Sequence, residues 1–158
     1  TAMEIRDGAQ STIVPLEQEV VFKFESGLPA FEECREFIFV MDKNLEPFLI
    51  MQSLNREDLS FVCIDPFIIT EDYTVKVNEN MMETLEIEDR NDILILAVVT
   101  VHEDMTLTTA NLMGPIVLNI KNNRAMQVIL DDIDSGYVRY NVWDGATKRE
   151  ERDASCAG

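Results

Sequence analysis

The sequence predicts a mostly β, single-domain, antiparallel β-barrel-like fold with one or two short helices. Short stretches of β-branched and aromatic residues recur along the chain, and several alternate apolar with polar residues, as half-buried strands do. Gly, Pro, Asn and Asp separate these stretches at turn positions. No long helical pattern lies between them, which excludes a βαβ parallel sheet and favours a barrel or a sandwich. Closure into a barrel would also remove exposed strand edges.

The first half of the chain contains five candidate strands. Residues 27–30 end the second of these strands, and Pro29 is suited to opening one helical turn. The polar residues 55–58 suit a hairpin turn. Asp65-Pro66 ends the hairpin because proline has no N–H for a strand ladder. The expected strands are residues 11–14, 20–25, 36–41, 48–54 and 59–64.

The second half adds a short helix and five further strands. Asn80 and Glu83 form a capping-box pattern that predicts a helix over residues 81–85. Residues 93–101 are apolar almost throughout, so both faces of that strand are expected to be covered. Gly114-Pro115 separates two strands, and Asn122-Asn123 forms a turn. The expected strands are residues 73–77, 93–101, 107–112, 116–120 and 125–130.

The length of 158 residues fits one domain. We place this domain at residues 3–143. Residues 147–158 contain no large apolar side chain, so we expect 144–158 to be a disordered C-terminal tail. Cys34, Cys63 and Cys156 are odd in number and far apart, which indicates neither a disulfide framework nor a zinc site. The cysteine usage, together with the lack of a signal-peptide pattern, favours the cytoplasm.

The charge balance restricts the classes of partner. Thirteen Lys and Arg residues against 30 Asp and Glu residues give a formal charge of −17. This argues against binding a nucleic-acid backbone, because each phosphate contact needs a basic side chain. It argues equally against an anionic membrane surface. Two readings stay open: a basic partner protein, or solubility alone.

Candidate catalytic chemistry is sparse. The only histidine, His102, is followed by Glu103 and Asp104, but consecutive residues of a strand point to opposite faces and do not converge easily. The sequence contains no nucleophile elbow, no phosphate-binding glycine loop and no helical zinc motif. Thirty carboxylates make close acidic pairs inevitable and give paired-acid catalysis no specific support. We therefore expect no enzyme, no cofactor and no metal site.

Five methionines leave two interpretations open. Met packs well against irregular surfaces, so these side chains suit either an adaptable binding surface or the core, and we favour the core for most of them. The five are Met81, Met82, Met105, Met113 and Met126.

Taken together, several motifs resemble the FliW-type flagellar assembly factors over residues 13–139. No single piece is specific; their order on a chain of this length carries the resemblance. The matching pieces are Gly-Leu-Pro-Ala-Phe-Glu at 27–32, Pro-Phe at 47–48, Gln-Ser-Leu at 52–54, Phe-Val-Cys-Ile-Asp-Pro-Phe at 61–67, the apolar run at 93–100, Thr-Ala-Asn-Leu at 109–112, Gly-Pro-Ile-Val-Leu-Asn at 114–119 and Gln-Val-Ile-Leu at 127–130.

The resemblance implies a small acidic protein that is not an enzyme and has two partners. One is CsrA, a basic RNA-binding dimer that represses translation of flagellin mRNA, and the other is flagellin. The implied mechanism is a partner switch, in which flagellin holds the factor until export frees it to bind CsrA and relieve repression. We expect a free monomer that binds neither nucleic acid nor membrane. One alternative is a flagellin-specific chaperone without effect on CsrA, and another is a small β-barrel enzyme or ligand carrier.

The candidate partner-binding residues fall into two groups. The motifs contain polar residues that would either bind a partner or satisfy backbone groups in turns. These are Gln52, Ser53, Asn111 and Asn119. For an acidic rim facing CsrA we select Glu71, Asp72, Glu103, Asp104, Asp131 and Asp132.

Overall fold

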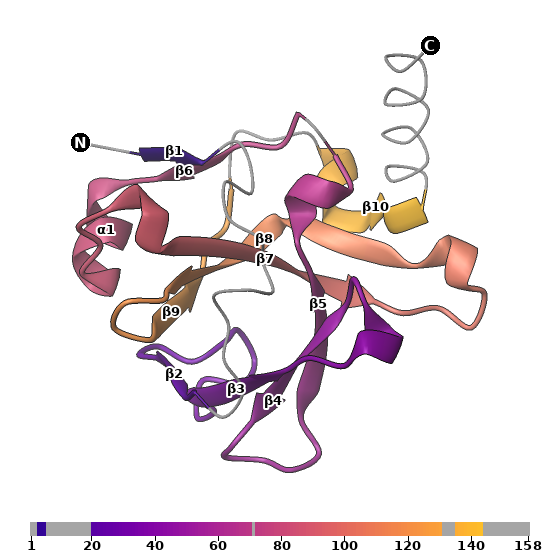
Figure 1. Cartoon of the computed structure of the whole chain (residues 1–158), viewed down its shortest axis with the longest axis horizontal. Coiled ribbons are helices and arrows are strands. Elements are labelled where there is room, and N and C mark those ends of the chain that lie inside the picture. The colour runs from indigo at the N-terminus through magenta and orange to yellow at the C-terminus, as the bar shows by residue number, and fades with distance from the viewer. Residues whose placement is uncertain (1–2, 6–19, 71, 131–134, 144–158) are drawn as a thin grey trace.

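Seven strands close into a barrel in the computed structural model, which describes residues 3–5, 20–70, 72–130 and 135–143 (Figure 1). The order around the barrel is β8-β7-β5-β4-β3-β2-β9, and β9 pairs back onto β8. These strands are β2 (Phe22–Phe24), β3 (Glu36–Val40), β4 (Leu49–Ser53), β5 (Ser60–Ile64), β7 (Ile93–Thr100), β8 (Thr109–Asn119) and β9 (Arg124–Gln127). The predicted mostly β, barrel-like fold is confirmed.

One pair in the barrel is parallel. Strands β2 and β9 run in the same direction, with Lys23 opposite Arg124 and Phe24 opposite Ala125. All other neighbours in the barrel are antiparallel. A closed ring with an odd number of strands cannot alternate direction at every step, so closure requires at least one parallel pair.

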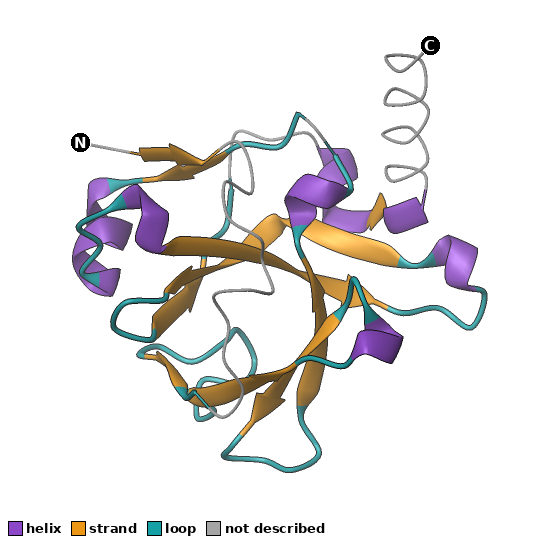
Figure 2. Ribbon diagram, viewed as in Figure 1, coloured by secondary structure: helices purple, strands orange, loops and turns teal. Residues whose placement is uncertain are grey.

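The remaining elements are short and lie outside the barrel. Figure 2 shows the α-helix and the 3-10 turns around the strands. Strand β1 (Met3–Ile5) pairs with β6 (Val75–Val77), and β10 (Tyr140–Asn141) extends the sheet beside β8. The helix is α1 (Glu79–Leu85), and the 3-10 turns are η1 (Lys43–Leu45), η2 (Pro66–Ile68), η3 (Arg90–Asp92), η4 (Met105–Leu107) and η5 (Ser135–Arg139).

Alternating side chains fill the barrel interior. Phe22 and Phe24 in β2 are buried while Lys23 between them is exposed, as the period-2 pattern predicts. Phe22 packs edge-on against Phe39 at 5.4 Å between ring centroids, and Phe24 against Phe37 at 5.2 Å. The interior cluster consists of Phe22, Phe24, Leu28, Cys34, Phe37, Phe39, Leu49, Met51, Leu59, Cys63, Leu94, Leu96, Ile116, Leu118 and Ala125.

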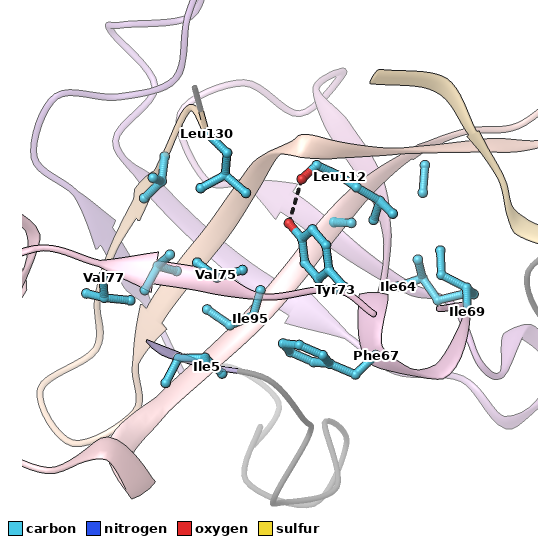
Figure 3. Close-up of a cluster of buried hydrophobic side chains, with 14 of the residues drawn as sticks. Ile5, Ile64, Phe67, Ile69, Tyr73, Val75, Val77, Ile95, Leu112 and Leu130 are labelled. Carbon is cyan, nitrogen blue, oxygen red and sulfur yellow. Dashed lines mark hydrogen bonds between the residues drawn. The ribbon is translucent and has the colours of Figure 1, made fainter. Parts of the chain in front are cut away.

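A second hydrophobic cluster lies on the outer face of β7 and β8. Ile95 and Ala97 in β7 point into it, whereas Leu94 and Leu96 point into the barrel. The predicted coverage of both faces of this strand is therefore confirmed. The β1–β6 pair, η2 and Tyr73 cover this second cluster, as Figure 3 shows. The Tyr73 hydroxyl donates a hydrogen bond to the Leu112 carbonyl at 2.6 Å, and burial raises the pKa of Tyr73, so the proton stays in place.

The prediction that Gly114-Pro115 separates two strands is wrong, because β8 runs through it. Leu96 pairs with Ile116, but Val98 pairs with Asn111, so β8 contains a bulge of extra residues opposite Ala97. The bulge removes the need for a ladder N–H at Pro115. It also changes which face the even-numbered residues occupy: Leu112 lies in the outer cluster, whereas Ile116 lies in the barrel.

Two local predictions also differ from the structure. The cap of α1 is Asn78, whose side chain accepts the Met81 N–H, and not Asn80. Pro29 does not open a helical turn: Phe31 N–H donates to the Leu28 carbonyl at 2.8 Å and Ala30 has φ of 71°, as in a type II turn. The predicted strand at 11–14 and the tail at 144–158 lie outside the described residues.

We predict that Tyr73→Phe lowers the free energy of unfolding by about 1–3 kcal/mol, because the buried Leu112 carbonyl would lose its donor. Urea denaturation measures this. Tyr140→Phe is the matched control, since Tyr140 is half-buried at the edge of the same cluster. Equal losses in the two variants would contradict a special role for the hydrogen bond.

Candidate functional site

Gln52 and Ser53 both stabilise the β4–β5 hairpin. The buried Ser53 Oγ accepts the N–H groups of Asn55 and Arg56 at 3.1 and 3.0 Å. The Gln52 Nε2 lies 3.0 Å from the Leu59 carbonyl oxygen, on the other side of the hairpin. Both side chains therefore satisfy backbone groups, which is one of the two roles left open for them.

Asn111 and Asn119 make similar backbone bonds in β8. The Asn111 Oδ1 accepts the N–H groups of Met113 and Gly114, both at 3.1 Å, which shapes the bulge. Asn119 is buried, and its Nδ2 donates to the Leu85 carbonyl at the end of α1 at 2.8 Å. Partner binding by these asparagines, and by Gln52 and Ser53, stays a prediction.

The predicted acidic rim is only partly within the described residues. Asp72 is exposed between η2 and β6, and Glu103 and Asp104 are exposed where β7 ends. Asp104 accepts hydrogen bonds from the Thr106 N–H at 3.0 Å and hydroxyl at 2.6 Å, which lower the pKa of its carboxyl group. Glu71, Asp131 and Asp132 lie outside the described residues.

The strongest concentration of acidic charge in the described chain surrounds α1. Six acidic residues and one basic residue lie between Glu79 and Asp92. Asn78 caps the start of α1, and Glu86 ends the helix in a left-handed conformation with φ of 53°. This reversal carries Glu86 and Glu88 back beside the helix. We call the residues Glu79, Met82, Glu83, Glu86, Ile87 and Glu88 the helix surface.

The helix surface forms an open groove of about 600 Å³. Its apolar members are Met82, which is half-buried, and Ile87, which is buried. Lys121 forms an ion pair with Glu88 at 3.1 Å, which raises the pKa of the lysine, and Arg124 contacts Glu86 at 3.1 Å. Glu83 makes no ion pair with another described residue. The groove therefore combines an apolar floor with an excess of negative charge.

Strand β7 separates this surface from the predicted rim. The helix surface precedes the start of β7, whereas Glu103 and Asp104 follow its end, and Figure 1 shows these ends far apart. The site prediction omitted the helix surface, although the sequence marks residues 86–92 as an acidic cluster. The density of acids between residues 79 and 92 was the available signal.

The methionines divide between the two predicted roles. Met81 and Met126 pack against the outer cluster as partly buried side chains, which agrees with the core interpretation. Met82 also packs against this cluster, but it lines the groove of the helix surface as well. Met105 is 43% exposed and is not part of either cluster.

Comparison with known proteins shows the family of this chain. The family model for FliW protein matches residues 8–142. The chain belongs to the FliW family. It is 40% identical over 121 residues to the flagellar assembly factor FliW of Caldanaerobacter subterraneus subsp. tengcongensis, covering 76% of this chain and 81% of that protein. It is 35% identical over 117 residues to the FliW of Bacillus subtilis, covering 74% and 82%.

A solved FliW structure has the same fold. The crystal structure of the flagellar assembly factor FliW superposes with a TM-score of 0.74 at 28% identity, covering 89% of this chain and 96% of that chain. The barrel interior of our FliW-family chain is filled by side chains. Within the described ranges, no group of three or more His, Cys, Asp or Glu residues is arranged to hold a metal ion, and no helix has the length and apolarity to cross a membrane.

We predict that Ser53→Ala destabilises the protein by about 1–2 kcal/mol, because two N–H groups of the hairpin turn lose their acceptor. Thermal or urea unfolding measures this. Ser60→Ala is the control, since Ser60 is exposed and lies opposite Gln52 in the same hairpin. Unchanged stability together with lost partner binding would instead assign Ser53 to an interface.

Proposed function

We propose that this chain binds CsrA and antagonises its repression of flagellin mRNA, with flagellin competing for the chain as a partner switch. Membership of the FliW family supports a role in flagellar assembly. The helix surface is the main support for a basic partner, because four glutamates surround the apolar floor of its groove. We propose that the chain acts in the cytoplasm as a monomer when free, without contacting nucleic acid or membrane.

Electrostatics provides a mechanism for antagonism. Binding of a basic dimer at the helix surface would bring a chain of formal charge −17 close to RNA phosphates. Exposed charges act over about 8–10 Å at physiological salt, so this repulsion reaches RNA without any contact. A coupling free energy of about 1–3 kcal/mol is typical when one ligand weakens another at a separate site. RNA release would then not require the chain to cover the RNA-binding residues.

The alternative is a flagellin-specific chaperone without effect on CsrA. The two functions differ in their dependence on CsrA. If the chain acts through CsrA, its removal lowers flagellin translation in cells that contain CsrA and leaves translation unchanged in cells that lack it. A chaperone alone would leave translation unchanged in both.

We predict that purified chain releases a labelled flagellin leader RNA from CsrA, saturably and less effectively as salt rises. Replacing Glu83, Glu86 and Glu88 together by Gln should weaken binding to CsrA about tenfold, since three surface charge interactions at about 0.5 kcal/mol each amount to about 1.5 kcal/mol. Fluorescence anisotropy of the RNA at low and high salt measures both effects.

The control removes the same charge elsewhere. Glu32, Glu33 and Glu57 are exposed at the turn end of the barrel, and their triple Gln variant should bind CsrA with nearly wild-type affinity. Equal weakening by the two triple variants would assign the effect to net charge and not to the helix surface. Absence of CsrA binding by the wild-type chain at any salt would overturn the proposed antagonism.

A further inference from the structure

Helix α1 ends in a way that its own sequence stabilises poorly. The last turn of the helix contains no basic side chain, and Glu86 and Glu88 follow it. The C-terminal end of a helix carries a partial negative charge, so glutamates are unfavourable there. Glu86 also has a φ of 53°, a left-handed conformation that is usual for glycine. A helix of seven residues is too short to compensate for these features by itself.

The turn between β8 and β9 supplies the groups that the helix lacks, and it lies beside the end of α1 (Figure 1). The side-chain amides of Asn119 and Asn122 both donate to the Leu85 carbonyl oxygen, at 2.8 and 2.9 Å. Asn119 also donates to the Glu86 carbonyl oxygen at 3.3 Å. Carbonyls at the end of a helix have no donor within the helix, so these bonds satisfy them. We call Asn119 and Asn122 the asparagine clamp.

Hydrogen bonds within the turn hold the asparagine clamp in place. The Asn119 Oδ1 accepts the Lys121 N–H at 3.0 Å, and the Asn122 Oδ1 accepts the Arg124 N–H at 3.1 Å. Each side chain therefore uses its oxygen within the turn and its nitrogen on the helix. An asparagine suits both tasks, because its side chain carries an acceptor and a donor.

The asparagine clamp acts on the segment that carries the glutamates of the helix surface. The Glu86 N–H donates to the Glu83 carbonyl at 3.2 Å, and the Ile87 N–H donates to the Met82 carbonyl at 2.9 Å. These two bonds close the reversal that brings Glu88 back beside the helix. Release of the Leu85 and Glu86 carbonyls would loosen this reversal and change the spacing of the glutamates.

We propose that the asparagine clamp positions the glutamates of the helix surface, and that Asn119 and Asn122 act in partner binding through the chain reversal at Glu86. For the effect on binding, this inference rests on the proposed function. Asn119 is only 1% exposed, so a bound partner would not touch it. The inference therefore gives this motif asparagine a role in binding without a place in the interface.

Hydrogen exchange tests the positioning without any partner. Asn122→Asp keeps the shape of the side chain and the acceptor for Arg124, but it replaces the donor to Leu85 by a carboxylate. Asn122 is exposed, so the core is not changed. We expect the Glu86 and Ile87 amides to exchange about tenfold faster than in the wild-type chain, with the amides of the barrel strands unchanged. Exchange is measured by NMR.

Binding separates positioning from charge, because the two predict opposite results. Asn122→Asp adds a negative charge beside the helix surface, and charge alone would tighten the binding of basic CsrA. Loss of the positioning should instead weaken it about threefold to tenfold, the effect of one lost hydrogen bond. Titration calorimetry on the full chain measures this. Asn119→Asp makes the same change at the buried position and should also weaken binding, measured below its unfolding temperature.

Asn111→Asp is the matched control. Asn111 is also in β8 and its Oδ1 also accepts backbone N–H groups, but it lies opposite Val98, towards the other end of the strand. The substitution adds the same charge and should change the affinity for CsrA by less than about twofold.

Two results would overturn the proposal and leave the proposed function intact. One is wild-type exchange of the Glu86 and Ile87 amides in Asn122→Asp, and the other is unchanged or tighter binding of CsrA by this variant. Absence of CsrA binding by the wild-type chain would overturn the proposed function, and with it the role of the asparagine clamp in binding.

Discussion

The two-sided burial of β7 and β8 is the constraint on which the rest of the structure depends. Leu94 and Leu96 fill the barrel, whereas Ile95 and Ala97 from the same strand form the outer cluster. Both clusters therefore share one pair of strands, and apolar residues on each side exclude water from the shared backbone. The β1–β6 pair, Tyr73 and α1 are held through the outer cluster, so their positions follow from the side chains that β7 and β8 present.

The bulge in β8 solves a problem that this constraint creates. In a regular strand, residues four positions apart point to the same face. Leu112 and Ile116 are four positions apart, but Leu112 lies in the outer cluster and Ile116 in the barrel, because the bulge lies between them. Asn111 satisfies the N–H groups that the bulge frees, which explains a polar side chain in an apolar stretch. Gly114 fits there because a Cβ atom would lie 3.0 Å from the Gln127 side chain.

Strand β7 separates two groups of exposed acidic residues. The helix surface, which precedes the start of β7, is acidic with an apolar floor, whereas Glu103 and Asp104 follow the end of β7. The helix surface has the charge that would complement the basic partner we propose.

The sequence alone determined many of the strands, turns and strand ends, because the responsible interactions are local. Alternation in Phe22 and Phe24, the polar turn at 55–58 and the strand end at Asp65-Pro66 involve residues within a few positions of one another. The excess of acidic residues and the family motifs are also properties of sequence. Tertiary structure decided the parallel closure of β2 on β9, the passage of β8 through Gly114-Pro115 and the separation of the acidic clusters. Each of these features depends on contacts between segments that are far apart in the sequence. A pattern within a few neighbouring residues does not specify which distant segments pair.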